Sequence, residues 1–210
     1  MATEQHNIRL VGPKEYAIKD SKFKAGKADG KFVNCTSQSP VAWQRELSPF
    51  FLGPVPLYDE YIAQNVENAW QYAKVYEEHV TEETKEPTPE YFIWAKSGWE
   101  NPNAVRFPKG RGAKPEYSLW EGQRLGYVAA RKRIYCPLYA SCVVETDGYK
   151  QLKHFYEENG ELTIWDFDGY DFAAKGMTLR DCLESTKLKM GHCFVLTMLL
   201  TDQLLWEHDA

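Results

Sequence analysis

The pattern of apolar and polar positions changes along the chain, from short irregular runs in the first third to longer helical periodicity afterwards. Apolar residues at three- and four-residue spacing predict amphipathic helices, and a brief apolar run before a turn predicts a strand. Together the patterns predict an α+β fold, helix-dominant, with short strands in a single compact domain. Helices are expected over residues 67–74, 91–99 and 117–139, the last broken by Pro137, from Thr178, and over 189–207. A short strand is expected from Leu162, running into a turn at Asp168-Gly169.

The most informative segment is ENAWQYAK, which begins at Glu67 and ends at Lys74. Residue steps of about 100° over this length make almost two turns, so both charged ends are expected on one helix face, roughly 10 Å apart with Gln71 between them. Asn65 is a candidate N-cap, which places Glu67 where free amides and the helix dipole favour an ionised carboxylate. Glu67 is therefore predicted to stabilise positive charge rather than to donate a proton. The alternative is a solvated polar stripe extended by Glu78.

Composition limits the class of protein. The chain has 210 residues, 43% hydrophobic and 26% charged, which is enough to bury a full core. Its net charge of −5 gives no general affinity for nucleic acid, although local basic patches can still provide one. The five cysteines form no C-x-x-C pair, so we expect reduced thiols in a cytoplasmic protein and no structural zinc site. No membrane span is expected, because the longest apolar run, around 194–200, is too short to cross a bilayer.

The first 46 residues are expected to form a basic extension with short, exposed strands, ahead of an α+β domain over residues 47–210. Lysine and arginine outnumber the acidic residues there, and Asp29-Gly30 is typical of a hairpin turn. Such a segment can contact a phosphate backbone, although a run of charge is more often a wet surface. The apolar stretch 47–55, punctuated by proline and glycine, predicts an ordered loop that leads into the helix of Glu67.

Two later loops differ in charge. Residues 77–90 are acidic and carry two prolines, which predicts a solvated loop between helices. Residues 106–114, RFPKGRGAK, are basic and contain glycine, and free amides with cations are suited to a phosphate or pyrophosphate. The segment lacks the residue order of a P-loop, so this pattern by itself does not specify a nucleotide.

The segment WDFDGYD, from Trp165 to Asp171, gathers three carboxylates and three aromatic rings at a predicted strand end. It fails as an EF-hand, because position twelve is Met177. Its D-x-D-G order is also that of haloacid-dehalogenase phosphatases, but too little chain follows for their fold. The structural alternative is an acidic turn that caps a strand, because Asp and Gly are ordinary turn residues.

A further interpretation pairs this turn with Glu67. Cleavage of an N-glycosidic bond builds positive charge on ribose, and the catalyst needs a carboxylate near that charge, a base for water and an acid for the leaving nitrogen. Glu67 and Asp168, with Asp166 in support, would supply the carboxylates, and Lys74 would orient a sugar hydroxyl or set the local charge. The candidate substrate contacts are Phe50, Trp70, Gly110, Arg111, Lys114, Trp165 and Gly169.

The order of these segments resembles the NADAR superfamily of N-glycosidases, whose characterised members act on ADP-ribosylated guanine in DNA or on ribosylamino-pyrimidine intermediates of riboflavin synthesis. The similar elements span roughly residues 47–205. They are the aromatic loop Phe50–Pro54, the helix of Glu67 and Lys74, Gly110-Arg111 with Pro115 and Trp120, the segment Ala130–Tyr139, Thr146 before a strand, the turn Trp165–Gly169, and a final helix over Met190–Leu200.

Two positions depart from that family's pattern. Asn68 follows the glutamate where the family commonly has histidine, and Gly191-His192 replaces a glycine-asparagine element. His192, at a predicted helix start, is either an acid that works near neutral pH or a buried histidine with its partners satisfied. The chain also resembles an uncharacterised group of proteins from large DNA phages and some eukaryotes that shares the ENAWQ helix.

The resemblance implies an N-glycosidase, independent of metal and cofactor, that hydrolyses an ADP-ribosyl or ribosyl nucleotide adduct, including an adduct on nucleic acid. The alternative is a non-catalytic nucleotide- or partner-binding protein that keeps the pocket, such as a phage counter-defence factor. A third interpretation is a scaffold whose basic N-terminal third contacts a partner. In each case we expect no membrane partner and a location in the cytoplasm, the host's if a phage encodes the chain.

Overall fold

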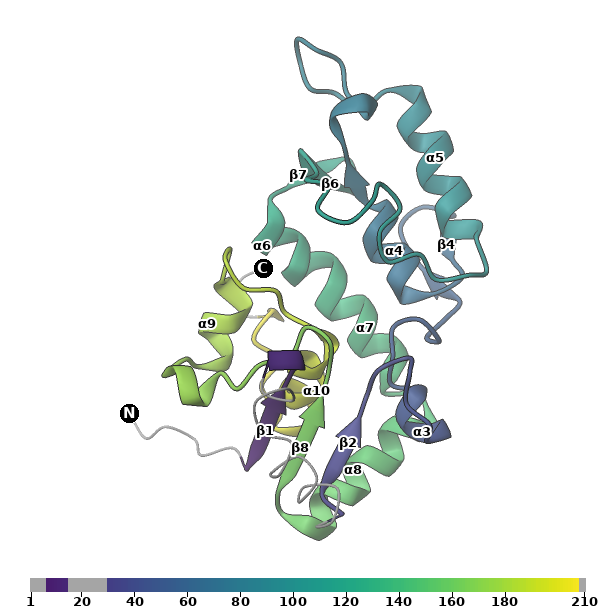
Figure 1. The fold of residues 1–210 in the computed structure, drawn as a ribbon. Helices are drawn as coiled ribbons and strands as arrows, with labels where there is room; N and C mark the ends of the chain where they lie inside the picture. Colours follow the sequence, from purple (N-terminus) through teal and green to yellow (C-terminus); the bar gives the residue numbers. More distant parts are fainter. Residues whose placement is uncertain (1–6, 15–29, 208–210) are drawn as a thin grey trace. The chain divides into compact units, whose positions relative to one another are not determined.

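The computed structural model describes residues 7–14 and 30–207 (Figure 1). The predicted α+β class, with short strands and more helix than strand, is confirmed. The chain divides into two compact units: unit 1 comprises Met1–Ser48 and Val143–Ala210, and unit 2 comprises Pro49–Cys142. Each unit has its own small sheet and its own helices.

Unit 1 is built on a sheet of three parallel strands in the order β1-β8-β2 (Figure 1). The strands are β1 (Ile8–Val11), β8 (Leu162–Trp165) and β2 (Phe32–Asn34). Val11 and Asn34 both stand opposite Trp165, so the three strands end at the same level. Leu10, Val33 and Ile164 are fully buried. The strands form because such apolar side chains each gain about 1.5–3 kcal/mol on burial.

This arrangement corrects the expectation for the first third of the chain. β1 and β2 do not form a hairpin with each other, because each pairs with β8. They are also not exposed, since Leu10 and Val33 lie in the core. Gly30 has a left-handed φ of 68° and is the described half of the predicted Asp29-Gly30 turn, while Asp29 and Lys19, Lys22, Lys24 and Lys27 lie outside the described residues.

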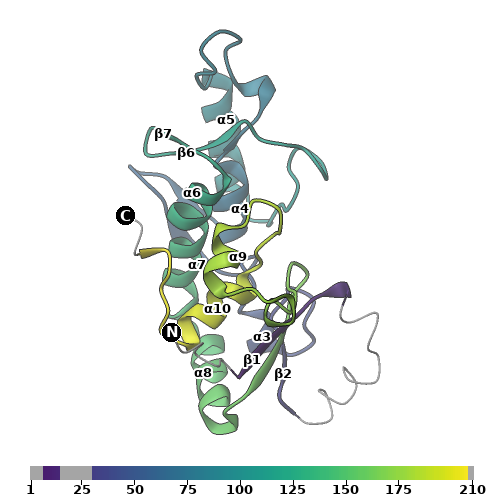
Figure 2. The ribbon, with the colours of Figure 1, turned by 90° about the vertical axis from the view of Figure 1, so that its left-hand side faces the viewer.

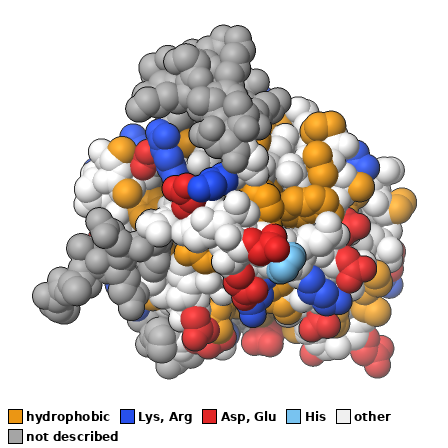
Figure 3. All heavy atoms as spheres, turned by 90° about the horizontal axis from the view of Figure 1, so that it is seen from below, with side chains coloured by type: hydrophobic (Ala, Val, Ile, Leu, Met, Phe, Trp, Pro, Cys, Tyr) orange, Lys and Arg blue, Asp and Glu red, His pale blue; other side chains and the backbone are white. Residues whose placement is uncertain are grey.

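An amphipathic helix, α8 (Asp147–Asn159), precedes β8. It starts at the N-cap Thr146, whose hydroxyl accepts a hydrogen bond from the amide of Tyr149, and it stops at Gly160, which has a φ of 66°. The expectation of a strand after Thr146 is therefore wrong. The short helix α3 (Ala42–Arg45) packs on α8, with the rings of Trp43 and Phe155 6.5 Å apart. The view from below Figure 1 shows acidic and basic side chains interspersed with a histidine (Figure 3).

Two further helices follow β8 in unit 1. α9 (Leu179–Glu184) begins with the predicted capping box, in which Thr178 and Asp181 exchange hydrogen bonds. α10 (His192–Leu200) is shorter than the helix expected over 189–207, and its residues up to Met198 are buried. It packs against β1, as Figures 1 and 2 show. None of the helices among the described residues has the length and apolarity needed to cross a membrane.

Unit 2 contains the helix of the ENAWQYAK segment. α4 (Val66–Tyr72) packs against α5 (Pro89–Glu100), and the two approach closely at Gly98, where a Cβ would lie 1.9 Å from the Tyr72 ring. The other short elements before α5 are β3 (Val55–Pro56), β4 (Ile62–Ala63), β5 (Lys74–Val75) and the 3-10 turn η1 (Glu77–His79). The helix predicted at 91–99 is therefore confirmed.

The segment 117–139, expected to be one helix, begins instead as a β-hairpin. β6 (Tyr117–Trp120) and β7 (Gln123–Leu125) are joined at Glu121-Gly122, both with left-handed φ values. The helical part follows as α6 (Tyr127–Ala130), the π-helical turn η2 (Arg131–Tyr135) and α7 (Cys136–Val143). Pro137 does not end it, because the π-helical turn just before it already changes the hydrogen-bond pattern that a proline would interrupt.

Candidate functional site

Among the described residues, each unit contains a cluster of polar side chains that are mostly buried. In unit 2 the cluster comprises Glu67, Gln71 and Lys74, and in unit 1 it comprises Cys35, Asp166 and His192. Buried polar groups need partners, because an unpaired one loses its water without compensation. The partners in each cluster therefore define what the site can do.

The unit 2 cluster starts at the cap of α4. The side chain of Asn65 accepts a hydrogen bond from the amide of Asn68 at 2.8 Å, which confirms the predicted N-cap and places Glu67 second in the helix. The helix ends at Tyr72, so Lys74 lies in β5, where it pairs with Ser118. The expectation that Glu67 and Lys74 share one helix face is therefore wrong, because Lys74 lies beyond the helix, in a strand.

The two charged residues are nevertheless joined through Gln71. The Gln71 amide nitrogen donates to Glu67 Oε1 at 2.8 Å, and Lys74 Nζ donates to the Gln71 amide oxygen at 2.6 Å. The amide thus offers a donor to the carboxylate, which accepts, and an acceptor to the ammonium, which donates. Glu67 and Gln71 are only 6% and 7% exposed, so the alternative of a solvated polar stripe is wrong for these two residues.

Aromatic rings lie beside this chain of hydrogen bonds. Lys74 Nζ stands 4.6 Å from the centre of the half-buried Trp70 ring, and Trp70 lies 5.4 Å from the Tyr135 ring. Arg131, in the π-helical turn, is 2% exposed, with its guanidinium 4.5 Å from the Tyr127 ring. π-helical turns are frequent at functional sites.

Sequence reasoning did not select Gln71 or Arg131 as site residues. Gln71 was placed only as the residue between two charges, although its position in ENAWQ could have identified it as their link. Arg131 belongs to the segment Ala130–Tyr139 but was not singled out there. Its side chain is buried in the π-helical turn.

Backbone bonds fix the loop of Phe50 against the start of α4. The carbonyl of Pro49 accepts from the amide of Glu67 at 3.1 Å, and that of Leu52 accepts from Val66 at 2.9 Å. The first amides of α4 are thus satisfied by this loop, and Phe50 is half-buried within it. The predicted ordered loop that leads into α4 is confirmed.

Asn68 anchors a second loop. Its amide nitrogen donates to the carbonyls of Asn101 and Asn103, each at 2.9 Å, and its oxygen accepts from the Val105 amide at 2.8 Å. This fully buried side chain uses all three contacts to hold the segment that leads into residues 106–114. Asparagine at this position therefore has a structural task, since histidine could not donate and accept in that pattern.

The basic loop itself is exposed. Arg106 and Arg111 lie on the Phe107 ring, with guanidinium carbons 5.3 and 5.4 Å from its centre. Gly110 has a φ of 88° and open space where a side chain would stand. Arg111 and Lys114 are exposed. The loop therefore carries two accessible cations at the predicted phosphate contacts.

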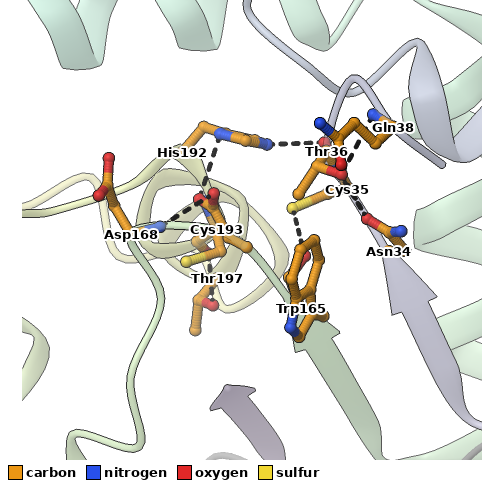
Figure 4. A network of polar contacts seen from close by, with 10 residues as sticks. Asn34, Cys35, Thr36, Gln38, Trp165, Asp168, His192, Cys193 and Thr197 are labelled. Atoms are coloured by element: carbon orange, nitrogen blue, oxygen red, sulfur yellow. Dashed lines mark hydrogen bonds and ion pairs between the residues drawn. The ribbon is translucent and has the colours of Figure 1, made fainter. Parts of the chain in front are cut away.

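In unit 1 the cluster lies where the parallel strands end. Asp166 follows β8, Cys35 follows β2, and His192 is the first residue of α10. Figure 4 labels Cys35 and His192 in this cluster. One ligand-type atom from each, a thiol sulfur, a carboxylate oxygen and a ring nitrogen, lies within 4.8 Å of the other two. Sequence reasoning did not group these residues.

Both ring nitrogens of His192 are engaged. Nδ1 lies 3.2 Å from Asp166 Oδ2, and Nε2 lies 2.7 Å from the carbonyl oxygen of Cys35. Asp166 Oδ2 also accepts from the backbone amide of Cys193 at 3.2 Å. His192 and Asp166 are 6% and 3% exposed. Of the two sequence interpretations, the buried histidine with satisfied partners is the one the contacts match.

Three glycines make room for this cluster. A Cβ on Gly191 would lie 2.1 Å from Asp166 Oδ2, and a Cβ on Gly12 would lie 1.9 Å from the carbonyl oxygen of Gly169. A Cβ on Gly169 would in turn lie 2.6 Å from the carbonyl oxygen of Val11. Gly169 therefore serves close backbone packing, in addition to any part it has in binding.

The buried thiols are poor nucleophiles. Burial raises the pKa of Cys35 and of Cys193 well above the ordinary thiol value, and the neighbouring Asp166 carboxylate raises both further. The Cys35 thiol donates to the carbonyl oxygen of Trp165 at 3.3 Å. Since the thiolate is the reactive form, neither residue is prepared for nucleophilic catalysis.

The acidic turn after β8 presents its two aspartates differently. Asp166 is buried, whereas the side chain of Asp168 is 28% exposed and stands 3.9 Å from Lys189 Nζ. The amide of Asp168 donates to Asp166 Oδ1 at 3.4 Å. Trp165 is half-buried, with its ring 4.9 Å from that of Phe167. Asp166 thus orients the turn, and Asp168 is the carboxylate that solvent can reach.

The predicted site residues therefore form two groups. Glu67, Lys74 and Trp70 are in contact in unit 2, which also contains Phe50 and the basic loop. The residues Trp165, Asp166, Asp168 and Gly169 form one turn in unit 1.

Comparison with known proteins gives a family but no activity. No curated protein sequence matches the chain. Residues 17–173 match the family described as a family of unknown function, DUF6939, and this match covers most of the chain. The matched segment includes the Glu67 cluster and the acidic turn, and it ends before α10. The chain therefore belongs to DUF6939, a family of unknown function.

Proposed function

We propose that the protein is an N-glycosidase of the NADAR type that hydrolyses an ADP-ribosyl or ribosyl nucleotide adduct. The observation that carries this proposal is the hydrogen-bonded chain from the buried Glu67 and Gln71 to the half-buried Lys74. Burying a carboxylate costs solvation, so a buried glutamate held in this way is unusual where only fold stability is at stake.

The roles follow from the chemistry of each group. Glu67, whose carboxylate accepts a hydrogen bond from the Gln71 amide, is assigned the task of stabilising positive charge on ribose. Lys74 fixes the Gln71 amide in its orientation and contributes the opposite charge. A carboxylate held in place before the reaction stabilises the transition state without having to reorganise during it.

The second carboxylate is assigned to Asp168, as the group that activates or positions water. Its partial exposure suits this task, whereas the buried Asp166 is assigned the task of positioning the turn. Phe50, Trp70 and Trp165 are proposed to stack the base, and Arg111 and Lys114, beside Gly110, to hold phosphate. Gly169 is proposed to let the substrate approach the turn.

The same proposal covers partners and location. A nucleotide or an ADP-ribosylated substrate is the expected partner, and nucleic acid would be held through the basic N-terminal segment. The chemistry needs no cofactor, and the thiols, which are free at all five cysteines, are consistent with a cytoplasmic protein.

Glu67→Gln tests the proposal most directly. Glutamine keeps the shape and an oxygen that accepts from Gln71, but it removes the charge. We expect the variant to lose at least about 100-fold in turnover of ADP-ribosylated DNA, the size of effect that removing one transition-state contact has elsewhere. Its melting temperature should change little.

Glu60→Gln is the matched control, because Glu60 is an exposed glutamate in the same unit. It should leave both turnover and melting temperature unchanged. Calorimetry with ADP-ribose should accompany both assays. Tight binding of ADP-ribose by a wild-type protein that releases no product would replace the glycosidase with a non-catalytic binding protein.

A further inference from the structure

The cluster of unit 1 lies at the edge of its sheet where ligands are usually bound. In sheets of parallel strands, binding sites form outside the carboxyl ends of the strands. Cys35 and Asp166 directly follow β2 and β8 at that edge, and His192, at the start of α10, lies beside them. Three atoms of the kinds that bind metal ions, from segments distant in sequence, thus lie together beside the ends of the strands.

Both ring nitrogens of His192 face oxygens that accept hydrogen bonds, and a neutral histidine can donate to only one of them. A neutral imidazole carries one N–H, and the carbonyl oxygen of Cys35, 2.7 Å from Nε2, can only accept a hydrogen bond. If Nε2 carries the hydrogen, Nδ1 presents a lone pair to Asp166 Oδ2 at 3.2 Å, and that oxygen is also an acceptor when ionised. Two acceptors in a buried contact repel each other unless a cation lies between them.

We propose that this cation is a metal ion of the zinc class, bound by Cys35 Sγ, the Asp166 carboxylate and His192 Nδ1. Thiolate, carboxylate and imidazole are the ligands that zinc takes in proteins. Ligand atoms about 2.05 Å from a tetrahedral zinc ion are about 3.3 Å apart, which is close to the Nδ1–Oδ2 distance of 3.2 Å. Histidines that bind metal ordinarily donate their other N–H to a carbonyl or carboxylate, as Nε2 is placed to do with Cys35.

Charge and protons balance in this arrangement. The Cys35 thiol donates to the carbonyl oxygen of Trp165 before metal binds. On binding, the S–H bond breaks, its proton leaves to solvent, and the sulfur electron pair goes to the ion without any change of oxidation state. One thiolate and one carboxylate then neutralise a divalent cation, so the buried site carries no net charge.

The site is separate from the proposed glycosidase chemistry. Its three residues lie in unit 1, and none belongs to the Glu67–Gln71–Lys74 chain. The ion has a structural role, in which it would join the ends of β2 and β8 to the start of α10. Loss of the ion is therefore expected to affect stability, whatever the protein hydrolyses.

The test uses the full chain, stripped with a chelator, dialysed and titrated with Co²⁺ as a spectroscopic probe for the site. We expect about one equivalent to bind and to produce a thiolate-to-cobalt charge-transfer band. Cys35→Ser should lose the band, and the control Cys142→Ser should keep it, because Cys142 is a half-buried thiol in the other unit. Zn²⁺ should displace Co²⁺ and raise the melting temperature, and His192→Gln should weaken binding by at least about tenfold.

Two results would overturn the proposal. One is a folded wild-type protein, judged by circular dichroism, that gives no charge-transfer band and no rise in melting temperature with Zn²⁺. A proton shared by His192 and Asp166 would then be the buried positive charge. The other is a band of undiminished intensity in Cys35→Ser. If that variant does not fold, the titrations of wild type and His192→Gln decide the question together. The charge-transfer band shows thiolate ligation, and undiminished binding by His192→Gln would place the ion outside this cluster.

Discussion

The two buried clusters differ in how far apart in sequence their members lie. In unit 2, Glu67, Gln71 and Lys74 lie within a single eight-residue segment, and each hydrogen bond spans three or four residues. In unit 1, the contact between His192 and Cys35 spans 157 residues. The hydrogen bonds of the first cluster join near neighbours in sequence, whereas those of the second form only after the parallel sheet and α10 have packed together.

They also differ in how their charges are satisfied. The unit 2 chain alternates an acceptor, an amide and a donor, so each described hydrogen bond joins groups of opposite character. The unit 1 cluster sets His192 between two oxygens that both accept. The unit 2 chain should therefore tolerate replacement of Glu67 by the neutral glutamine. The stability of the unit 1 cluster should instead depend on a positive charge close to those two oxygens. Stability measurements on matched variants distinguish the two cases.

The largest expected effect is that of His192→Ala. Removing the ring leaves the Asp166 carboxylate buried with one partner fewer, and breaking a buried pair in this way typically costs about 3–5 kcal/mol. We expect a loss of this size in the free energy of unfolding, measured with urea and circular dichroism. His154→Ala is the control, because His154 is exposed on α8 and should change stability by less than about 0.5 kcal/mol. A similar small effect at both histidines would show that the unit 1 cluster is not a stabilising contact.

The next effect tests how closely that cluster is packed. Gly191→Ala should destabilise the protein by about 2 kcal/mol, because its Cβ would lie 2.1 Å from a buried oxygen of Asp166. Gly126→Ala is the control, since no atom lies within 4 Å of the added Cβ. As Gly126 caps α6, alanine there should cost less than about 1 kcal/mol. Equal losses at both glycines would mean that close packing around Asp166 is not what fixes Gly191.

The contrast between the clusters also explains what the sequence could predict. The cap at Asn65, the position of Glu67, the strand that begins at Leu162 and the capping box of Thr178 all depend on neighbours a few residues away, and each was confirmed. Such features follow from local hydrogen bonding and periodicity, which a single sequence contains.

Features that depend on distant partners were missed. The pairing of β1 and β2 with β8 requires contacts over more than a hundred residues, and no local pattern distinguishes it from a hairpin at Asp29-Gly30. The hairpin over 117–125 was missed because its apolar positions also fit a helical period, and Glu121-Gly122 was not recognised as a turn. No sequence pattern identified Cys35 as a site residue, because only folding places it beside Asp166 and His192.

Alkaline pH should weaken the cluster of unit 1 through its thiols. Burial raises the pKa of Cys193 in the folded state, so its contribution is complete below the unfolded thiol pKa of about 8.5 and is lost as pH rises above that value. At about one pH unit above it, we expect a loss of about 1.4 kcal/mol for this thiol. Urea unfolding at a series of pH values should show a steeper decline for the wild type than for Cys193→Ser, because serine does not titrate there. If stability declined equally with pH in wild type and in Cys193→Ser, the pKa of the Cys193 thiol would not be raised by burial.

The smallest effect is expected at an ion pair on the surface of unit 2. Lys109 Nζ lies 2.9 Å from Glu78 Oε1, and the Glu78 side chain is 56% exposed, so water screens the pair. The hydrogen bond with Lys109 lowers the pKa of Glu78, so this stability is present above the ordinary carboxyl pKa of about 4.3 and is lost as pH falls through the lower folded value. Glu78→Gln should cost no more than about 0.5 kcal/mol at neutral pH, and the difference from wild type should vanish in acid. A loss as large as that of His192→Ala would mean that burial does not separate strong from weak polar contacts in this protein, since the exposed and buried pairs would then contribute equally.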